Sequence, residues 1–133
     1  MNSADRDALV NGYIAACQWH WDKEGVFRKK DESESAVDQL VSVVSRDPPL
    51  AWELIRDIAN QDQSEEVLDR LANGSLTTLL QSNPELLSRI EADAAQNPHI
   101  GELFSYIWDD HDFPESTWNR VLAISGDNDQ HAV

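Results

Sequence analysis

The chain has 133 residues, enough for one domain with one core, and its 25 acidic against 10 basic residues give a formal net charge of −15. A single cysteine, Cys17, excludes an internal disulfide, and no uninterrupted apolar run approaches the roughly 20 residues that cross a bilayer. Because the first residues also lack a secretory signal, we expect a protein of the reducing cytoplasm that has no membrane partner.

The negative charge is concentrated after residue 30, where 21 acids stand against five arginines and no lysine. Such a surface repels phosphate groups, so it disfavours direct nucleic-acid binding, and it attracts basic proteins. The other interpretation of the charge is that it only keeps the protein in solution.

The first half of the chain predicts three helices. Asn2 or Ser3 is suited to cap the first helix, and residues 22–35 lack an apolar period and predict a loop. Asp47-Pro48-Pro49 ends the second helix and opens the third. The predicted apolar stripes are Leu9, Val10, Tyr13, Ile14, Cys17 and Trp21, then Val37, Leu40, Val41 and Val44, then Leu54, Ile55 and Ile58.

The second half carries clearer start and stop signals. Ser64 opens a helix that Gly74 is expected to end, and Ser75 is expected to cap a short helix after it. Asn83-Pro84 and Asn97-Pro98 each pair a capping side chain with proline at the first helical position. Helical periods continue to Leu122, and residues 126–133 are expected to form a disordered tail.

These patterns predict an all-α fold of seven or eight short antiparallel helices in a single domain over residues 1–125. Two architectures fit, a compact bundle or a HEAT-like stack of helical hairpins. The apolar patterns of residues 49–58 and 98–107 match, which favours the stack.

Motifs that carry chemistry are scarce, since the chain has no phosphate-binding glycine loop, nucleophile elbow or Cys-x-x-Cys pair. The densest cluster is Asp109, Asp110, His111 and Asp112, residue types that can bind a divalent cation. It falls between two predicted helices without converging ligands, so we expect an acidic linker, no metal and no cofactor. Cys17 lies on an apolar stripe, where thiols are usually inert.

The five tryptophans divide into two groups. Trp52, Trp108 and Trp118 have aliphatic neighbours at helical spacing and are expected in the core, with Arg56 lying over Trp52. Trp19 and Trp21 would point about 200° apart on a helix, so with Trp21 on the apolar stripe Trp19 is expected to line an edge or a binding surface.

Several segments together resemble an uncharacterised bacterial family of small helical proteins, a domain of unknown function, over about residues 36–124. The resemblance rests on residues 51–55, the Leu-Ala-x-Gly-x-Leu-x-x-Leu-Leu segment at residues 71–80, residues 90–94, Trp108 and residues 118–121. This chain has Asn73 and Ser75 where the family tends to have alanine and proline. The resemblance implies a helical fold and no particular activity.

Three function classes follow, and the first is favoured: an acidic inhibitor, such as an immunity or antagonist protein, that captures a basic effector and is not an enzyme. The second is a general helical adaptor or scaffold. The third is a metal-dependent enzyme that uses the cluster at residues 109–112 with His20 or His99. For the inhibitor, the expected partner-binding residues are Trp19, Trp21, Asp62, Glu65, Glu66, Asp109, Asp110, Asp112 and Glu115.

Overall fold

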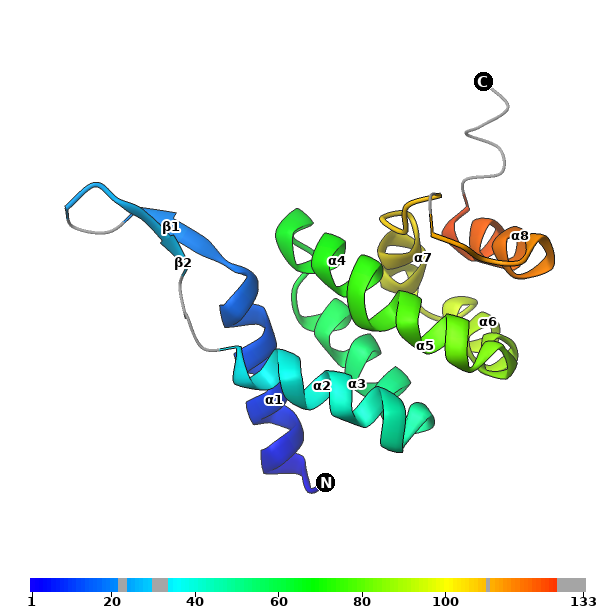
Figure 1. Cartoon of the computed structure of the whole chain (residues 1–133), viewed down its shortest axis with the longest axis horizontal. Coiled ribbons are helices and arrows are strands. Elements are labelled where there is room, and N and C mark those ends of the chain that lie inside the picture. The colour runs from blue at the N-terminus through cyan, green and yellow to red at the C-terminus, as the bar shows by residue number, and fades with distance from the viewer. Residues whose placement is uncertain (22–23, 30–33, 110, 127–133) are drawn as a thin grey trace.

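The computed structural model describes residues 1–21, 24–29, 34–109 and 111–126, with only the backbone described at residues 19–21 and 27–29 (Figure 1). Over these residues the chain forms eight α-helices and one short hairpin, so the predicted all-α fold is confirmed. The elements are α1 (Ser3–Cys17), β1 (Trp19–Trp21), β2 (Phe27–Lys29), α2 (Ser35–Arg46), α3 (Pro48–Gln61), α4 (Glu65–Leu71), the π-helical turn η1 (Ala72–Leu76), α5 (Thr77–Ser82), the 3-10 turn η2 (Pro84–Leu86), α6 (Leu87–Ala94), α7 (Pro98–Phe104) and α8 (Glu115–Ser125).

The hairpin corrects two of the expectations. Helix α1 ends at Cys17, and β1 pairs with β2 in an antiparallel register that sets Trp19 opposite Lys29 and Trp21 opposite Phe27. Trp21 therefore does not continue the apolar stripe of the first helix, and the predicted loop contains a strand. Alternating aromatic residues favour a strand over a helix, and Gly25, at φ +78°, takes the left-handed conformation that the reversal requires.

Three of the six predicted helix starts are confirmed by side-chain hydrogen bonds, whereas Ser64 and Asn83 precede α4 and η2 without a side-chain capping bond. The side chain of Asn2 accepts from the Asp5 N–H at 2.8 Å, Asp47 accepts from Leu50 at 3.3 Å, and Asn97 accepts from His99 at 3.1 Å. In the last two cases proline occupies the first turn, where a backbone N–H has no partner within the helix, so the proline loses no hydrogen bond.

The predicted stop at Gly74 is wrong, because the chain continues from α4 through η1 into α5 without leaving the helical region. Gly74 is not among the glycines with positive φ, so it does not form a C-terminal cap, and Ser75 does not begin a new helix. The wider π-turn is closed at Thr77, whose N–H and hydroxyl both donate to the Ala72 carbonyl, the hydroxyl at 2.7 Å. Leu71 and Leu76 are fully buried on either side of it, and this burial favours continuing the helix.

The helices share one hydrophobic core that runs from Leu9 to Val121. Helix α3 lies at its centre and contacts α1 and α2 on one side and α4, α5 and α7 on the other (Figure 1). The two segments of matching pattern, in α3 and α7, therefore pack directly against each other. The architecture is therefore the predicted compact bundle, because in a stack of helical hairpins each hairpin would contact only the hairpins next to it.

Within the described residues, no helix has both the length and the apolar character needed to cross a membrane. The predicted disordered tail, apart from Gly126, lies outside the described residues.

Trp52 ties α3 to α6 at the centre of the core. Its indole Nε1 donates to Asp93 Oδ2 at 2.7 Å, and the Arg56 guanidinium donates to the same oxygen at 3.2 Å. Arg56 was expected to lie over the Trp52 ring, and the structure instead brings both side chains to one carboxylate. Trp52 is fully buried, so the hydrogen bond fixes the polar edge of an otherwise apolar side chain.

Replacing Trp52 with phenylalanine should lower the free energy of unfolding by about 2 to 4 kcal/mol, because it removes one charge-assisted hydrogen bond and leaves a cavity. Urea denaturation followed by circular dichroism measures the change. The matched control is Trp108→Phe: Trp108 is 55% exposed, and its replacement should cost less than about 0.5 kcal/mol. Equal losses in the two variants would contradict the assigned role of Trp52.

Candidate functional site

The strongest candidate site is the segment between α7 and α8, which is held in place by Asn73 of the π-turn. The Asn73 side-chain nitrogen donates to the Tyr106 carbonyl at 2.8 Å and to the Asp69 carbonyl at 3.1 Å. Its side-chain oxygen accepts from the Trp108 backbone N–H at 2.8 Å. One amide thus joins the backbone of Tyr106 and of Trp108 to the end of helix α4.

Asn73 also positions the ring of His111, whose Nε2 lies 2.9 Å from Asn73 Oδ1 and must carry the hydrogen of that bond. A row of aromatic rings extends from there. His111 stacks on Trp108 with centroids 6.2 Å apart, and Phe113 meets the other side of His111 edge-on at 6.3 Å. Phe113 in turn stacks on Trp118 of α8 at 6.1 Å.

Trp108 differs from the core position predicted for it. It is 55% exposed, while Trp118 is half-buried and Trp52 is fully buried. Helix α7 ends at Phe104, so Trp108 lies beyond the helical period that would have turned it inward. An exposed tryptophan with a fixed backbone is a common anchor of protein interfaces.

Exposed carboxylates follow this tryptophan in the chain. Asp109 and Asp112 lie after it in the same segment, and Glu115 begins α8. On α4, Glu65 and Glu66 lie one turn before Asp69, which accepts from Asn73. Helical spacing places these acids on a face that leads to the Trp108 segment. We call the set the acidic–aromatic surface: Glu65, Glu66, Asp69, Trp108, Asp109, Asp112 and Glu115.

The basic side chains are engaged elsewhere. Four of the five arginines after residue 30 form ion pairs that join helices or fix their ends: Arg56 with Asp93 at 3.2 Å, Arg70 with Glu34 at 2.9 Å, Arg89 with Glu53 at 3.2 Å, and Arg120 with Glu91. The Arg120 hydrogen bond lowers the pKa of Glu91. In contrast, no ion pair to any described residue is made by Glu65, Glu66, Asp109, Asp112 or Glu115. Their charge is therefore uncompensated within the described part of the chain.

The other predicted partner-binding residues have different outcomes. Asp62 is half-buried, and its two oxygens accept from Gln18 Nε2 and from the Ser64 N–H, each at 2.8 Å, so it fixes the start of α4. Trp19 and Trp21 lie on β1, but their side chains are outside the described residues, as is Asp110. The sequence gives no indication that Asn73 holds this segment, because that role depends on a π-turn for which the sequence carries no local signal.

The described candidate catalytic groups have different surroundings. Cys17 is buried, and desolvation raises the pKa of its thiol, which keeps it protonated and unreactive. The His99 ring lies 3.9 Å from the carboxylate of Glu102, and the side chain of His20 is outside the described residues. Among the described residues, no three His, Cys, Asp or Glu side chains are placed to hold a metal ion. Since Asp110 is not described, the absence of a metal stays a prediction.

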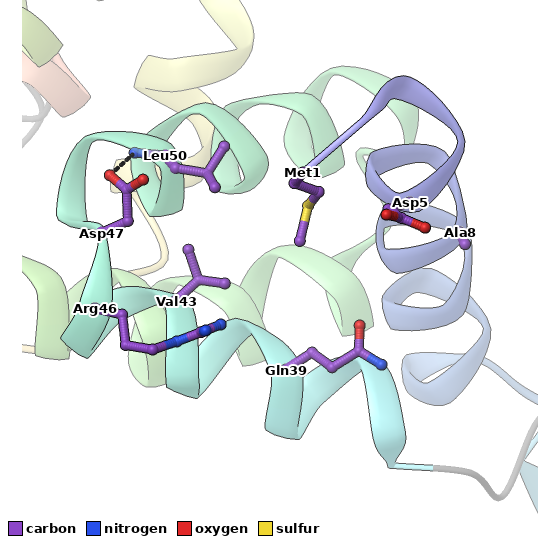
Figure 2. Close-up of a pocket in the computed structure, with 8 residues that line it drawn as sticks. All are labelled: Met1, Asp5, Ala8, Gln39, Val43, Arg46, Asp47 and Leu50. Carbon is purple, nitrogen blue, oxygen red and sulfur yellow. Dashed lines mark hydrogen bonds between the residues drawn. The ribbon is translucent and has the colours of Figure 1, made fainter.

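A wide groove of about 630 Å³ lies at another place, between the start of α1, α2 and the start of α3 (Figure 2). Asp5, Arg46 and Asp47 bring charges of both signs to it, and Asp47 is already bonded to the Leu50 N–H. The groove is open to solvent, and Arg46 offsets part of its negative charge, so it is less acidic than the acidic–aromatic surface.

The fold defines the chain as a compact, mainly helical protein. A family model described as a family of unknown function (DUF6869) matches residues 18–128, and the chain belongs to this family. The match begins just before the hairpin and extends beyond α8, so it is longer than the resemblance in the sequence. Neither the curated proteins nor the solved structures that were compared gave a match.

Asn73→Asp should release the Trp108 segment, because it removes the amide donor to Tyr106 and sets a second carboxylate against Asp69. We expect amide hydrogen exchange at Trp108 and Ile107 to accelerate by at least tenfold, while exchange in α3 changes little. Asn119→Ala, at an exposed position on α8, is the matched control. Unchanged exchange at Trp108 would show that Asn73 does not hold the segment.

Purified protein should retain no stoichiometric divalent ion after dialysis, since the described side chains of the 109–112 cluster point to no converging ligand set. Elemental analysis measures this, together with the melting temperature of Asp110→Ala, which should stay within about 2 °C of the parent. One equivalent of bound metal would favour the enzyme hypothesis instead.

Proposed function

We propose that the protein is a cytoplasmic inhibitor that captures a basic effector protein, as an immunity or antagonist protein does, and that it acts without catalysis. The observation that carries the proposal is an exposed Trp108 on a segment fixed by Asn73, next to carboxylates that no described cation neutralises. Charge and anchor thus lie on one surface.

The two kinds of residue would contribute differently to binding. The acids attract a basic partner over a distance of about a Debye length, ~8 Å at physiological salt, and mainly raise the association rate. Trp108 supplies apolar area that is lost to water on binding, and it mainly slows dissociation. Because Asn73 already orders the backbone, little conformational entropy is lost when the partner binds.

An adaptor that collects several partners is the main alternative. An adaptor would bind proteins without blocking their activity, whereas an inhibitor must cover or distort the active site of one partner. Loss of the partner's activity in the complex therefore separates the two functions.

We expect the host's basic partner, once isolated with the tagged full chain, to bind with an association rate that falls at least tenfold between 50 and 500 mM salt. The triple variant Asp109→Asn, Asp112→Asn, Glu115→Gln should slow association and flatten this salt dependence. Trp108→Ala should leave association nearly unchanged and speed dissociation by about 30-fold, the ~2 kcal/mol typical of a hot spot. Surface plasmon resonance over a salt series measures both rates.

The charge-matched control neutralises Asp5, Asp7 and Asp38, three exposed acids near the start of α1 and α2. It removes the same number of negative charges but leaves the acidic–aromatic surface intact. If the control slows association as much as the triple variant does, net charge rather than this surface directs binding. An acidic partner, or a partner that stays fully active in the complex, would overturn the proposal. Trp19→Ala and Trp21→Ala test separately whether the hairpin, rather than Trp108, is the anchor.

A further inference from the structure

A second hollow, smaller and more enclosed than the groove, lies where α2 passes the π-turn. Its volume is about 220 Å³, and it is lined from α1, α2, the end of α4, η1 and the start of α5. It shares no lining residue with the acidic–aromatic surface, so a ligand there would be a separate property of the molecule.

One wall of this cavity is apolar and comes from α2. Val37, Val41 and Val44 lie three and four residues apart, which places them on one stripe of the helix. Val41 was predicted to face the core, yet it is 55% exposed. An exposed valine at the rim of an apolar hollow is suited to contact an apolar ligand.

Two buried residues bring hydroxyl groups to the lining of the cavity. Tyr13 is 1% exposed and Ser75 is 6% exposed, and neither hydroxyl bonds another described residue. A hydroxyl that lines a cavity can donate a hydrogen bond to a ligand and accept one from it. Burial also raises the pKa of Tyr13, so its hydroxyl keeps its proton and can donate.

The π-turn accounts for the space. Gly74 has no side chain, and a Cβ atom built there would meet no atom within 4 Å. Gly74 and Ser75 thus line a gap that an ordinary helical side chain would occupy. Wide turns of this kind are frequently found at functional sites.

Charge at the rim selects against ions. Arg70 lines the cavity and opposes a cationic ligand, while its guanidinium is already bonded to Glu34 at 2.9 Å. An anion would have to compete with Glu34 and approach a protein of net charge −15. A neutral ligand meets neither penalty.

We propose that this cavity binds a small neutral molecule, mainly apolar and the size of one substituted ring, with a hydroxyl or carbonyl group that bonds Tyr13 and Ser75. The volume agrees, because a cavity of about 150 Å³ is known to hold benzene. The valines of α2 contact the apolar part of the ligand, and the two hydroxyls fix its polar end.

Three probes with the same ring distinguish the ligand classes: benzyl alcohol, benzoate and benzylamine, each titrated into the ¹⁵N-labelled full chain. We expect benzyl alcohol to cause saturable amide shifts at Val44, Gly74 and Ser75, with both ions binding at least tenfold more weakly. Gly74→Leu should fill the cavity and abolish the shifts, whereas Ala123→Leu, an exposed change on α8, should leave them unchanged.

Tyr13→Phe removes only a hydroxyl that has no partner, so it should fold normally and bind benzyl alcohol about fivefold more weakly, the effect of one neutral hydrogen bond. Equal affinity of all three probes, shifts that persist in Gly74→Leu, or shifts confined to residues outside the cavity would each overturn the proposal. None of these results bears on capture of a basic protein, which is tested by its own variants.

Discussion

Helix α3 is buried along most of its length, and the positions of the other helices follow from the apolar residues of α3 that they cover. Its apolar residues include Ala51, Leu54, Ile55 and Ile58, all with no exposed surface, so neighbours are needed on more than one side. Helices α1 and α2 cover one side and α4, α5 and α7 the other. The charged residues of α3, such as Glu53 and Asp57, are only half-buried and lie beside this wide apolar face, and the compact fold follows from covering that face.

The close approach of α1 and α2 contributes to that cover. A Cβ atom at Gly12 would lie 3.0 Å from the Ala36 Cβ, so a glycine is what allows the two helices to come so near each other. Trp52 completes the arrangement from within, since its bond to Asp93 joins α3 to α6. The few basic side chains also join other helices to α3, since Arg6 and Arg89 both bind Glu53 of α3, at 3.3 and 3.2 Å. What remains at the surface is therefore mostly negative.

Local signals in the sequence predicted the helices well, because a cap such as Asn2, Asp47 or Asn97 needs only its own next few residues. Features that depend on distant contacts were missed. The helix through Gly74 continues because Leu71 and Leu76 are buried by other elements, and the sequence around a glycine does not contain that information. Trp108 is exposed because Asn73, far away along the chain, holds its backbone. The strand at β1 was missed because three residues are too few to establish an alternating period against a helical one.

The π-turn has two faces, and each belongs to a different surface. Asn73 faces the Trp108 segment, while Ser75, two residues later and so on the opposite side of the helix, lines the cavity. The five residues of the turn are thus shared between two places that have no lining residue in common. A small molecule that favours one geometry of the turn would change the affinity of the Trp108 segment for a protein, and by thermodynamic reciprocity the protein would change the affinity for the small molecule by the same factor.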